Sequence, residues 1–363
     1  MCANCILDTQ DDPKISFNDK GVCSYCTSFS EIDKEKKTSN NAIIIKNIID
    51  KIKFEGKNNE YNCLIGISGG VDSPYLAYQA KLLGLKPLMV HYDNGWNSEL
   101  AVKNIEKVLS NLKLDLKTYV NEWKEFKDIQ LSFLKASVID IELITDQAII
   151  AVLYKTAKKH NIKYILTGHN FDTEAILPRN WYHWKLDVLN IKAIHKKFGS
   201  VKIKTYPFIS FLERLFIDKY SNIKTIRLLD YLPYNKEEAK KTLIEKFEWQ
   251  DYGGKHYESI FTRFYQGYIL PVKFGVDKRK AHLSTLICSG QISKEEALEE
   301  MKKSPYEENM LREDMDFVLK KFNLTETEFN EIMKLPIKAH TDYPSYYNRH
   351  YKVMGWFGKI AGV

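Results

Sequence analysis

The chain contains 363 residues, of which 44% are hydrophobic and 28% charged, so it can form one large domain or two to three smaller ones with real cores. Its net charge is +7, but only seven of the 54 basic residues are Arg, and we predict no nucleic-acid partner. No apolar stretch is long enough to span a membrane, and the first residues lack the basic start and apolar run of a signal peptide. These features predict a cytoplasmic protein with no membrane partner.

Four of the six cysteines are grouped near the N-terminus with the spacing C-x2-C-x17-C-x2-C, namely Cys2, Cys5, Cys23 and Cys26. Two such pairs in a chain without a secretory signal are typical of a tetrahedral zinc site. Four thiolates close the coordination sphere, so the zinc is predicted to be structural and not catalytic. An iron–sulfur cluster or a redox pair is the alternative.

Helical and strand-like patterns alternate through the next part of the chain. Helices are predicted over residues 43–54, 73–83, 99–112, 122–134 and 146–160, and strands over residues 63–67, 86–91, 116–120 and 164–167. Ser73 and Pro74 are predicted to cap and start the helix that follows the first strand. The alternation predicts an α/β fold with a doubly wound parallel sheet.

Beyond about residue 231 the pattern becomes mainly helical. Two capping boxes are predicted there, formed by Ser293 with Glu296 and by Thr325 with Glu328. We therefore divide the chain into a four-cysteine zinc module over residues 1–40, an α/β domain over residues 41–230 and a mainly helical domain over residues 231–363. The last of these is predicted to bind a substrate or a partner.

The strongest chemical signal directly follows the first predicted strand, where six residues form a loop: Ser68, Gly69, Gly70, Val71, Asp72 and Ser73. Two glycines let the backbone turn sharply and bring its N–H groups to an anion, and the start of the next helix adds partial positive charge. Asp72 offers oxygen ligands for Mg²⁺. The run is neither a Walker A loop nor a dinucleotide-binding G-x-G-x-x-G motif. An incidental turn with a serine cap is the alternative.

This loop resembles the SGGxDS signature of the PP-loop ATP pyrophosphatase superfamily, whose members hold the pyrophosphate of ATP in the loop and transfer AMP to an oxygen atom. The resemblance implies a Rossmann-like fold of the adenine nucleotide alpha hydrolase type. It places the ATP site on the loop and on four residues at or just after the ends of other strands, namely His91, Asp93, Gly168 and His169. It also implies three catalytic groups, Asp72, Asp172 and Glu174, of which Asp72 and Asp172 would bind Mg²⁺. An ordinary polar loop with a helix cap is the alternative for residues 168–174.

The part of the chain after residue 230 indicates which family of this superfamily the sequence resembles. Together with the cysteine module and the loop, five distal segments resemble the N-acetyl sugar amidotransferases of bacterial surface-glycan biosynthesis, the WbpG-like and PseA-like group. The segments are residues 231–238, 253–259, 261–268, 274–284 and 289–292. Such an enzyme would convert an acetamido group into an acetamidino group with ATP and ammonia, and would release AMP and pyrophosphate. Its product would serve lipopolysaccharide O-antigen, or pseudaminic or legionaminic acid for flagellin glycosylation. A PP-loop enzyme that modifies tRNA, of the thiolase or lysidine-synthase type, is the alternative.

The resemblance implies ATP, Mg²⁺ and a structural Zn²⁺ as cofactors. It also suggests substrate contacts from the distal motifs, with a structural ion pair or a solvated position as the alternative for each: Lys255, His256, Arg263, Gln266, Lys278, Arg279 and His282.

The ammonia source follows from the cysteines. Cys2 is predicted to bind zinc, Cys63 lies in a buried strand, and Cys288 follows an apolar run, so none suits a glutaminase nucleophile. We therefore predict that ammonia comes from solution or from a separate glutaminase. For the second route, the family resemblance implies a cyclase-like channel subunit.

Overall fold

The computed structural model describes residues 1–38, 40–253 and 257–347. Its centre is a five-stranded sheet in the order β3-β2-β1-β4-β5, in which every neighbouring pair is parallel. The strands are β1 (Cys63–Gly66), β2 (Pro87–Asp93), β3 (Leu116–Val120), β4 (Tyr164–Leu166) and β5 (Lys224–Ile226). The strand order reverses between β1 and β4, and ligands of such sheets bind at this point, beyond the carboxyl ends of the strands.

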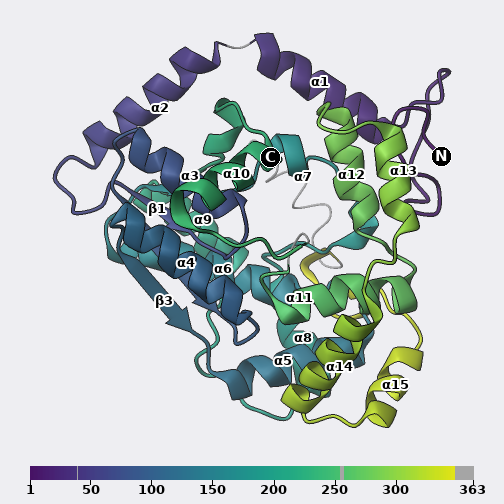
Figure 1. The fold of residues 1–363 in the computed structure, drawn as a ribbon. Coiled ribbons are helices and arrows are strands. Elements are labelled where there is room, and N and C mark those ends of the chain that lie inside the picture. The colour runs from purple at the N-terminus through teal and green to yellow at the C-terminus, as the bar shows by residue number, and fades with distance from the viewer. Residues whose placement is uncertain (39, 254–256, 348–363) are drawn as a thin grey trace.

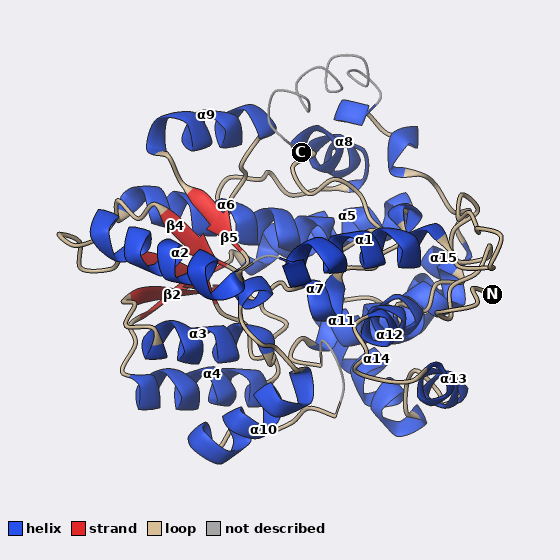
Figure 2. Cartoon of the chain, turned by 90° about the horizontal axis from the view of Figure 1, so that it is seen from above, coloured by secondary structure: helices blue, strands red, loops and turns tan. Residues whose placement is uncertain are grey.

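Helices make up most of the remaining chain (Figures 1 and 2). Those before β5 are α1 (Ser24–Thr38), α2 (Asn41–Glu55), α3 (Asp72–Leu82), α4 (Glu99–Leu112), α5 (Trp123–Ala136), α6 (Leu143–Lys159), α7 (Phe171–Glu174), η1 (Arg179–Trp181), α8 (Val188–Phe198) and α9 (Phe211–Ser221). Those after β5 are η2 (Leu228–Tyr231), α10 (Lys236–Phe247), α11 (Ile260–Phe264), η3 (Tyr265–Phe274), α12 (Arg279–Cys288), α13 (Lys294–Lys302), α14 (Glu308–Phe322), α15 (Glu326–Lys334) and η4 (His340–Asp342).

The two faces of the sheet are buried against different helices. Cys63 and Ile65 of β1 join a core with residues of α2, α3, α4 and α10, whereas Leu64 points into a larger core that includes α5, α6 and α8. Successive side chains of a strand point to opposite faces, so an almost wholly apolar strand such as β1 has to be covered on both. Figure 2 shows this layered arrangement, with α3, α4 and α10 on one side of the strands.

The predicted fold class is confirmed, and the four predicted strands correspond to β1–β4. The sequence pattern did not predict β5, because its three residues include two exposed positions and it lies at the edge of the sheet. The helix-starting role of Ser73 was wrong: α3 begins at Asp72 with Val71 in the N-cap position, and no side chain caps this helix.

The region after residue 231 is mainly helical, as predicted, and both predicted capping boxes are present at the starts of α13 and α15. Its first helix, α10, packs on α3 and α4 and so belongs to the core on that side of the sheet. The division of the chain into three domains stays a prediction. Within the described residues, every helix is too short or too polar to cross a membrane.

Candidate functional site

The loop after β1 is held in shape by its two serines. The backbone N–H of Ser68 donates to the hydroxyl of Ser73 at 3.0 Å, and the two hydroxyls lie 3.3 Å apart. The N–H of Gly70 points to the Ser68 hydroxyl at 3.4 Å. The loop therefore closes on itself directly before α3, which places the start of an eleven-residue helix beside it.

Two aromatic side chains that follow α10 in the sequence pack on the same loop. The carbonyl oxygen of Gly69 accepts hydrogen bonds from the Tyr252 hydroxyl at 2.6 Å and from Trp249 Nε1 at 3.1 Å. A Cβ atom at Gly69 would lie 2.4 Å from that hydroxyl and 2.7 Å from the Cβ of Ala101. Gly69 is thus required by close packing, because no side chain fits between the loop and its cover.

Asp72 lies at the start of α3, where its Oδ1 accepts a short hydrogen bond from the hydroxyl of Tyr234. Burial and the neighbouring Asp72 raise the pKa of Tyr234 well above its ordinary value, so the phenol keeps its proton and donates it. The side chain that sequence analysis identified as a magnesium ligand is therefore positioned by a residue 162 positions away.

The loop after β4 approaches the first loop closely at Gly168. A Cβ atom at Gly168 would lie 3.0 Å from the backbone nitrogen of Ser73 and 3.1 Å from the carbonyl carbon of Asp72. Both of these neighbours are backbone atoms, which cannot move aside. The structure thus brings the two predicted halves of the ATP site into contact, as expected where the strand order reverses.

The residues of that second loop are paired with one another and with the helices around them. His169 Nδ1 lies 2.5 Å from Glu174 Oε2, while Asn170 caps α7 by accepting from the N–H of Thr173. Asp172 Oδ1 lies 4.0 Å from Lys36 Nζ of α1, which also lies 3.8 Å from Asp230 Oδ1. Within the described residues, only the four N-terminal cysteines form a group of three or more potential metal ligands. Magnesium binding by Asp72 and Asp172 stays a prediction.

His91 and Asp93 lie at the carboxyl end of β2 and support the geometry of the adjoining loops. His91 is buried, and its ring nitrogens lie 2.9 Å from the carbonyl oxygen of Ile67 and 2.9 Å from Asn97 Nδ2. Asp93 Oδ1 accepts from the N–H of Gly95 at 2.8 Å and from Asn97 Nδ2 at 3.2 Å. His91 therefore ties the end of β2 to Ile67, which directly precedes the loop at residues 68–73 (the phosphate loop), and its place in the ATP site stays a prediction.

Glu258 reaches the phosphate loop from the C-terminal region. Its Oε1 would lie 3.3 Å from a Cβ atom at Gly70, and its carbonyl oxygen accepts from the N–H of Ser98. The N–H of Ile260 in turn donates to the carbonyl of Trp96. The segment around residues 258–260 is thus fixed along the residues that follow β2.

The predicted substrate residues divide into several groups. Arg263 forms a two-pronged ion pair with Asp314, at 2.6 and 2.7 Å, and Arg279 does the same with Asp277. His282 Nδ1 lies 3.1 Å from the carbonyl oxygen of Thr173 in α7. Gln266 is half-buried on η3, whereas Lys255 and His256 lie outside the described residues. Substrate contact by these residues stays a prediction.

Lys278 belongs to a group of charged side chains around the start of α6. Lys185 Nζ lies 2.7 Å from Asp140 Oδ2 and 2.9 Å from Asp146 Oδ2, and the Thr262 hydroxyl donates to Glu142 at 2.9 Å. Burial, with a smaller effect of Asp146, raises the pKa of Glu142 to about 7. Burial also lowers the pKa of Lys278. The helix α6 contacts β1, β2 and β4, and because it connects to β4 its start lies toward the carboxyl ends of these strands.

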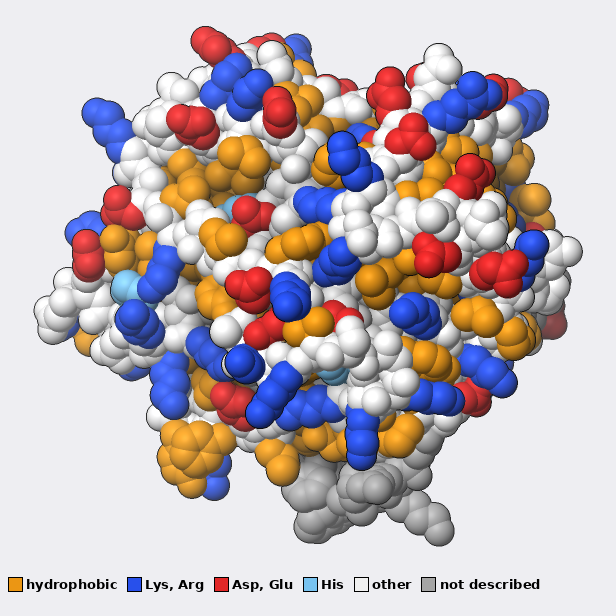
Figure 3. All heavy atoms as spheres, turned by 90° about the horizontal axis from the view of Figure 1, so that it is seen from below, with side chains coloured by type: hydrophobic (Ala, Val, Ile, Leu, Met, Phe, Trp, Pro, Cys, Tyr) orange, Lys and Arg blue, Asp and Glu red, His pale blue; other side chains and the backbone are white. Residues whose placement is uncertain are grey.

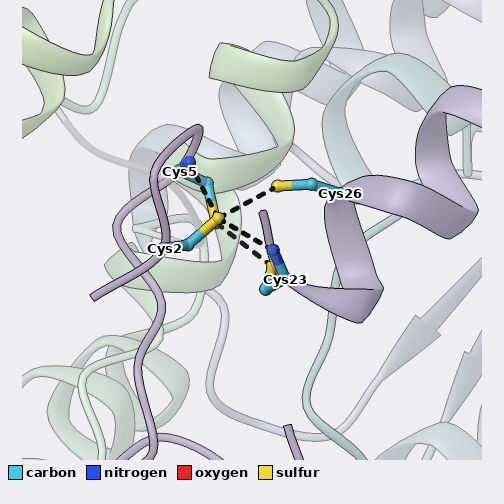
Figure 4. Close-up of side chains that lie close together, drawn as sticks. All are labelled: Cys2, Cys5, Cys23 and Cys26. Carbon is cyan, nitrogen blue, oxygen red and sulfur yellow. Dashed lines mark hydrogen bonds between the residues drawn. The ribbon is translucent and has the colours of Figure 1, made fainter. Parts of the chain in front are cut away.

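The four N-terminal cysteines converge, as Figure 4 shows. All four are buried, and their sulfur atoms lie within 4.8 Å of one another. The Cys2–Cys26 and Cys5–Cys23 sulfur distances are 3.9 and 3.7 Å. Zn–S bonds of about 2.3 Å in a tetrahedron require sulfurs about 3.8 Å apart, so the arrangement fits one zinc ion. A four-iron cluster would need the thiolates further apart, because each binds a different iron of the cube.

A fifth cysteine, which the spacing did not indicate, lies beside this cluster. Cys288 ends α12, and its sulfur lies 3.4 Å from that of Cys26. Asn4 Nδ2 lies 3.5 Å from both sulfurs. Lys294 of α13 donates to the carbonyl of Cys2 at 2.7 Å. The cysteine module is therefore attached to α12 and α13, beside which it lies in Figure 1.

The chain has the PP-loop class of nucleotide-binding fold. Three features define this class here: the sheet order, the SGGVDS loop at the carboxyl end of β1 and the adjoining loop after β4. Residues 258–355 match the C-terminal domain of the WbpG-like LPS biosynthesis proteins. This match agrees with the resemblance drawn from the distal motifs, of which those at residues 261–268, 274–284 and 289–292 lie inside the matched range. Comparison with curated proteins yields no match.

Solved structures with some likeness include an NH3-dependent NAD synthetase from Campylobacter jejuni, with 17% identity over 58% of this chain and 94% of that one and a TM-score of 0.30. An NMN synthetase from Francisella tularensis has 14% identity over 59% and 88%, with a TM-score of 0.30. The U34-tRNA thiolase NcsA from Methanococcus maripaludis, solved with its [4Fe-4S] cluster, has 14% identity over 71% and 80%, with a TM-score of 0.31. Scores this low support no functional conclusion.

Proposed function

We propose that the chain is an ATP-dependent amidotransferase that converts the N-acetyl group of a sugar into an acetamidino group. The observation that carries the proposal is the contact between its two signatures: the WbpG-like segment begins at Glu258, whose carboxylate lies beside Gly70 of the phosphate loop. A bacterial surface glycan, either an O-antigen sugar or a nonulosonic acid of the pseudaminic or legionaminic type, is the proposed destination of the product.

The proposed chemistry follows from the poor reactivity of an amide. Its carbon is a weak electrophile and its oxygen a poor leaving group, so the oxygen first attacks the α-phosphorus of ATP. The bond from the α-phosphorus to the bridging oxygen breaks, and pyrophosphate and an O-adenylyl imidate form. Ammonia then adds to the imidate carbon, and the C–O bond breaks to release AMP and leave the amidine, with protons passing to solvent or a base.

The protein contributes positioning and charge compensation to these steps. The N–H groups of the loop at residues 68–73 and the start of α3 would receive the departing pyrophosphate. Magnesium, when bound, would neutralise phosphate charge, and Asp72 and Asp172 are its proposed ligands. Tyr234 fixes the orientation of Asp72 by its hydrogen bond.

The nitrogen is proposed to arrive as ammonia, either free or from a separate glutaminase with a cyclase-like channel subunit. Five of the six cysteines lie in or against the N-terminal cysteine cluster, a predicted zinc site. The sixth, Cys63, is wholly buried in β1, and burial raises its pKa. Within the described residues, no cysteine is hydrogen-bonded to a histidine, the arrangement that activates a glutaminase thiol.

The test is the product pattern of the purified chain with ATP, Mg²⁺, ammonium and a panel of acetamido sugars. The expected products are AMP, pyrophosphate and a sugar whose mass shows replacement of oxygen by NH. Release of ADP and phosphate would contradict the PP-loop chemistry. AMP formation that depends on tRNA, with no sugar accepted, would favour the tRNA-modifying alternative.

A further inference from the structure

The helix α1 connects the zinc cluster to the loop after β4. It begins at Ser24, carries the zinc ligand Cys26 in its first turn and extends to Thr38. Ten residues, or about 15 Å of helix, separate Cys26 from Lys36. Phe29 and Lys36 are seven residues apart, so they lie on the same face of the helix. Figure 1 shows α1 reaching from the cysteine module toward α7.

That face contacts the loop at two points. The ring of Phe29 stacks on the ring of Phe171, with centroids 4.3 Å apart and planes inclined by 25°. Lys36 Nζ lies 4.6 Å from the centroid of the same Phe171 ring. It also lies 4.0 Å from Asp172 and 3.8 Å from Asp230.

The loop depends on such contacts because it has little stability of its own. The helix α7 spans only Phe171–Glu174, far shorter than a helix that persists alone in water. Asp230 accepts from the N–H of Phe171 at 2.6 Å, which fixes the start of α7 from one side. The stacked ring of Phe29 and the ammonium of Lys36 fix it from the side of α1.

We propose that α1 is a positioning element of the nucleotide site: zinc fixes the start of the helix, and Phe29 and Lys36 hold the loop after β4 against the phosphate loop. Lys36 lies between Asp172 and Asp230, which also pairs with Arg227, and so holds the carboxylate of Asp172, a proposed magnesium ligand, in place at the start of α7. This inference rests on the proposed function only in taking ATP as the ligand. It assigns the zinc module a role at the ATP site as well as in folding.

The experiment compares four single variants with the wild-type chain, three of them at lysines of α1 and the fourth Phe29→Leu. Lys36→Met removes the charge and keeps most of the apolar stem, and Lys36→Arg restores the charge. Lys34→Met is the matched control, because Lys34 is exposed two residues earlier on the same helix. The measurements are the affinity for Mg²⁺ with a non-hydrolysable ATP analogue, by calorimetry, and amide hydrogen exchange of residues 168–174 without nucleotide. Zinc content is determined for each protein.

The expected result is that Lys36→Met weakens analogue binding roughly three- to tenfold, as for a partly exposed ion pair, and speeds exchange in residues 168–174 with zinc retained. Lys36→Arg and Lys34→Met should match the wild type. Phe29→Leu, which keeps apolar area but removes the stacked ring, should also speed exchange. Unchanged affinity and unchanged exchange in Lys36→Met, or equal effects of Lys34→Met, would overturn the inference. A wild-type chain that binds no analogue would contradict the proposed function, while the exchange data would still decide whether α1 positions the loop.

Discussion

The cysteine module and the cationic residues of the C-terminal region were both identified from sequence, and the structure places them in different surroundings. The four cysteines lie together with zinc-like spacing, whereas Arg263 and Arg279 are occupied by Asp314 and Asp277. Clustered thiols are rare and need one another, so their spacing specifies the site. A guanidinium binds whichever carboxylate the fold brings near it, and for Arg263 that carboxylate is 51 residues away.

Among variants that test this comparison, the largest effect on folding is expected from the loss of a predicted zinc ligand. We expect Cys23→Ser to abolish zinc binding and to unfold the N-terminal module, because structural zinc contributes on the order of 10 kcal/mol to folding of small modules. The measurements are metal content and proteolytic susceptibility of residues 1–38. Cys63→Ser, which changes a buried cysteine outside the cluster, is the control for zinc content. Because the Cys288 thiol lies 3.4 Å from that of Cys26 and offers a replacement ligand, the same measurement is made on Cys23→Ser combined with Cys288→Ser, and full zinc occupancy there would show that the cluster is not the metal site.

The next effect concerns the ion pair of Arg263 and Asp314, whose side chains are only 14% and 7% exposed. Arg263→Met leaves Asp314 buried without its partner, and we expect a loss of about 3–5 kcal/mol in the free energy of unfolding. The more exposed Arg279→Met should cost less. Urea denaturation checks both variants. If Arg263→Met were fully stable but failed to use the sugar, Arg263 would be a substrate residue and the ion-pair interpretation would be wrong.

A smaller and pH-dependent effect is expected at Glu142. Its pKa of about 7 lies above its ordinary value of 4.5 because burial disfavours the carboxylate, with Asp146 adding repulsion and Lys278 and Lys185 opposing it. The folded state therefore holds the proton more tightly than the unfolded state. The associated stability is present below about pH 4.5 and is lost as the pH rises through 7.

Glu142→Gln cannot titrate, so relative to the wild type it should gain up to about 3 kcal/mol between pH 5 and pH 8. Thermal unfolding of both proteins at the two pH values measures this difference in stability. The titration of all other groups contributes equally to both proteins and cancels in the difference. A difference between the two proteins that does not change with pH would show that Glu142 titrates normally.

Sequence patterns predicted the features that arise from neighbouring residues. The apolar runs predicted β1–β4, and the loop at residues 68–73 joins β1 to α3 as its composition indicated. The serine cap failed because Ser73 bonds back to Ser68 inside the loop and does not cap the helix. A strand as short and exposed as β5 has no periodicity to detect.

Several site residues were missed by sequence analysis because their partners lie far away in the sequence. Tyr234 contacts Asp72 across 162 residues, and Cys288 contacts Cys26 across 262. Lys36 and Glu258 reach the two loops from α1 and from the C-terminal region. Tyr234 and Glu258 lie within the distal segments singled out from the sequence, but those segments gave neither residue a role, and Lys36 and Cys288 lie outside them. Only the packed fold assigns the four residues to their sites.

The most direct test of the proposed function follows the amide oxygen. An acetamido sugar labelled with ¹⁸O in its carbonyl group is incubated with the chain, ATP, Mg²⁺ and ammonium, and the AMP is examined by mass spectrometry. Because the amide oxygen is proposed to attack the α-phosphorus and to leave with the adenylyl group, one ¹⁸O atom should appear in each AMP formed. Unlabelled AMP, with the label retained in the sugar or released to water, would contradict the proposed O-adenylyl imidate.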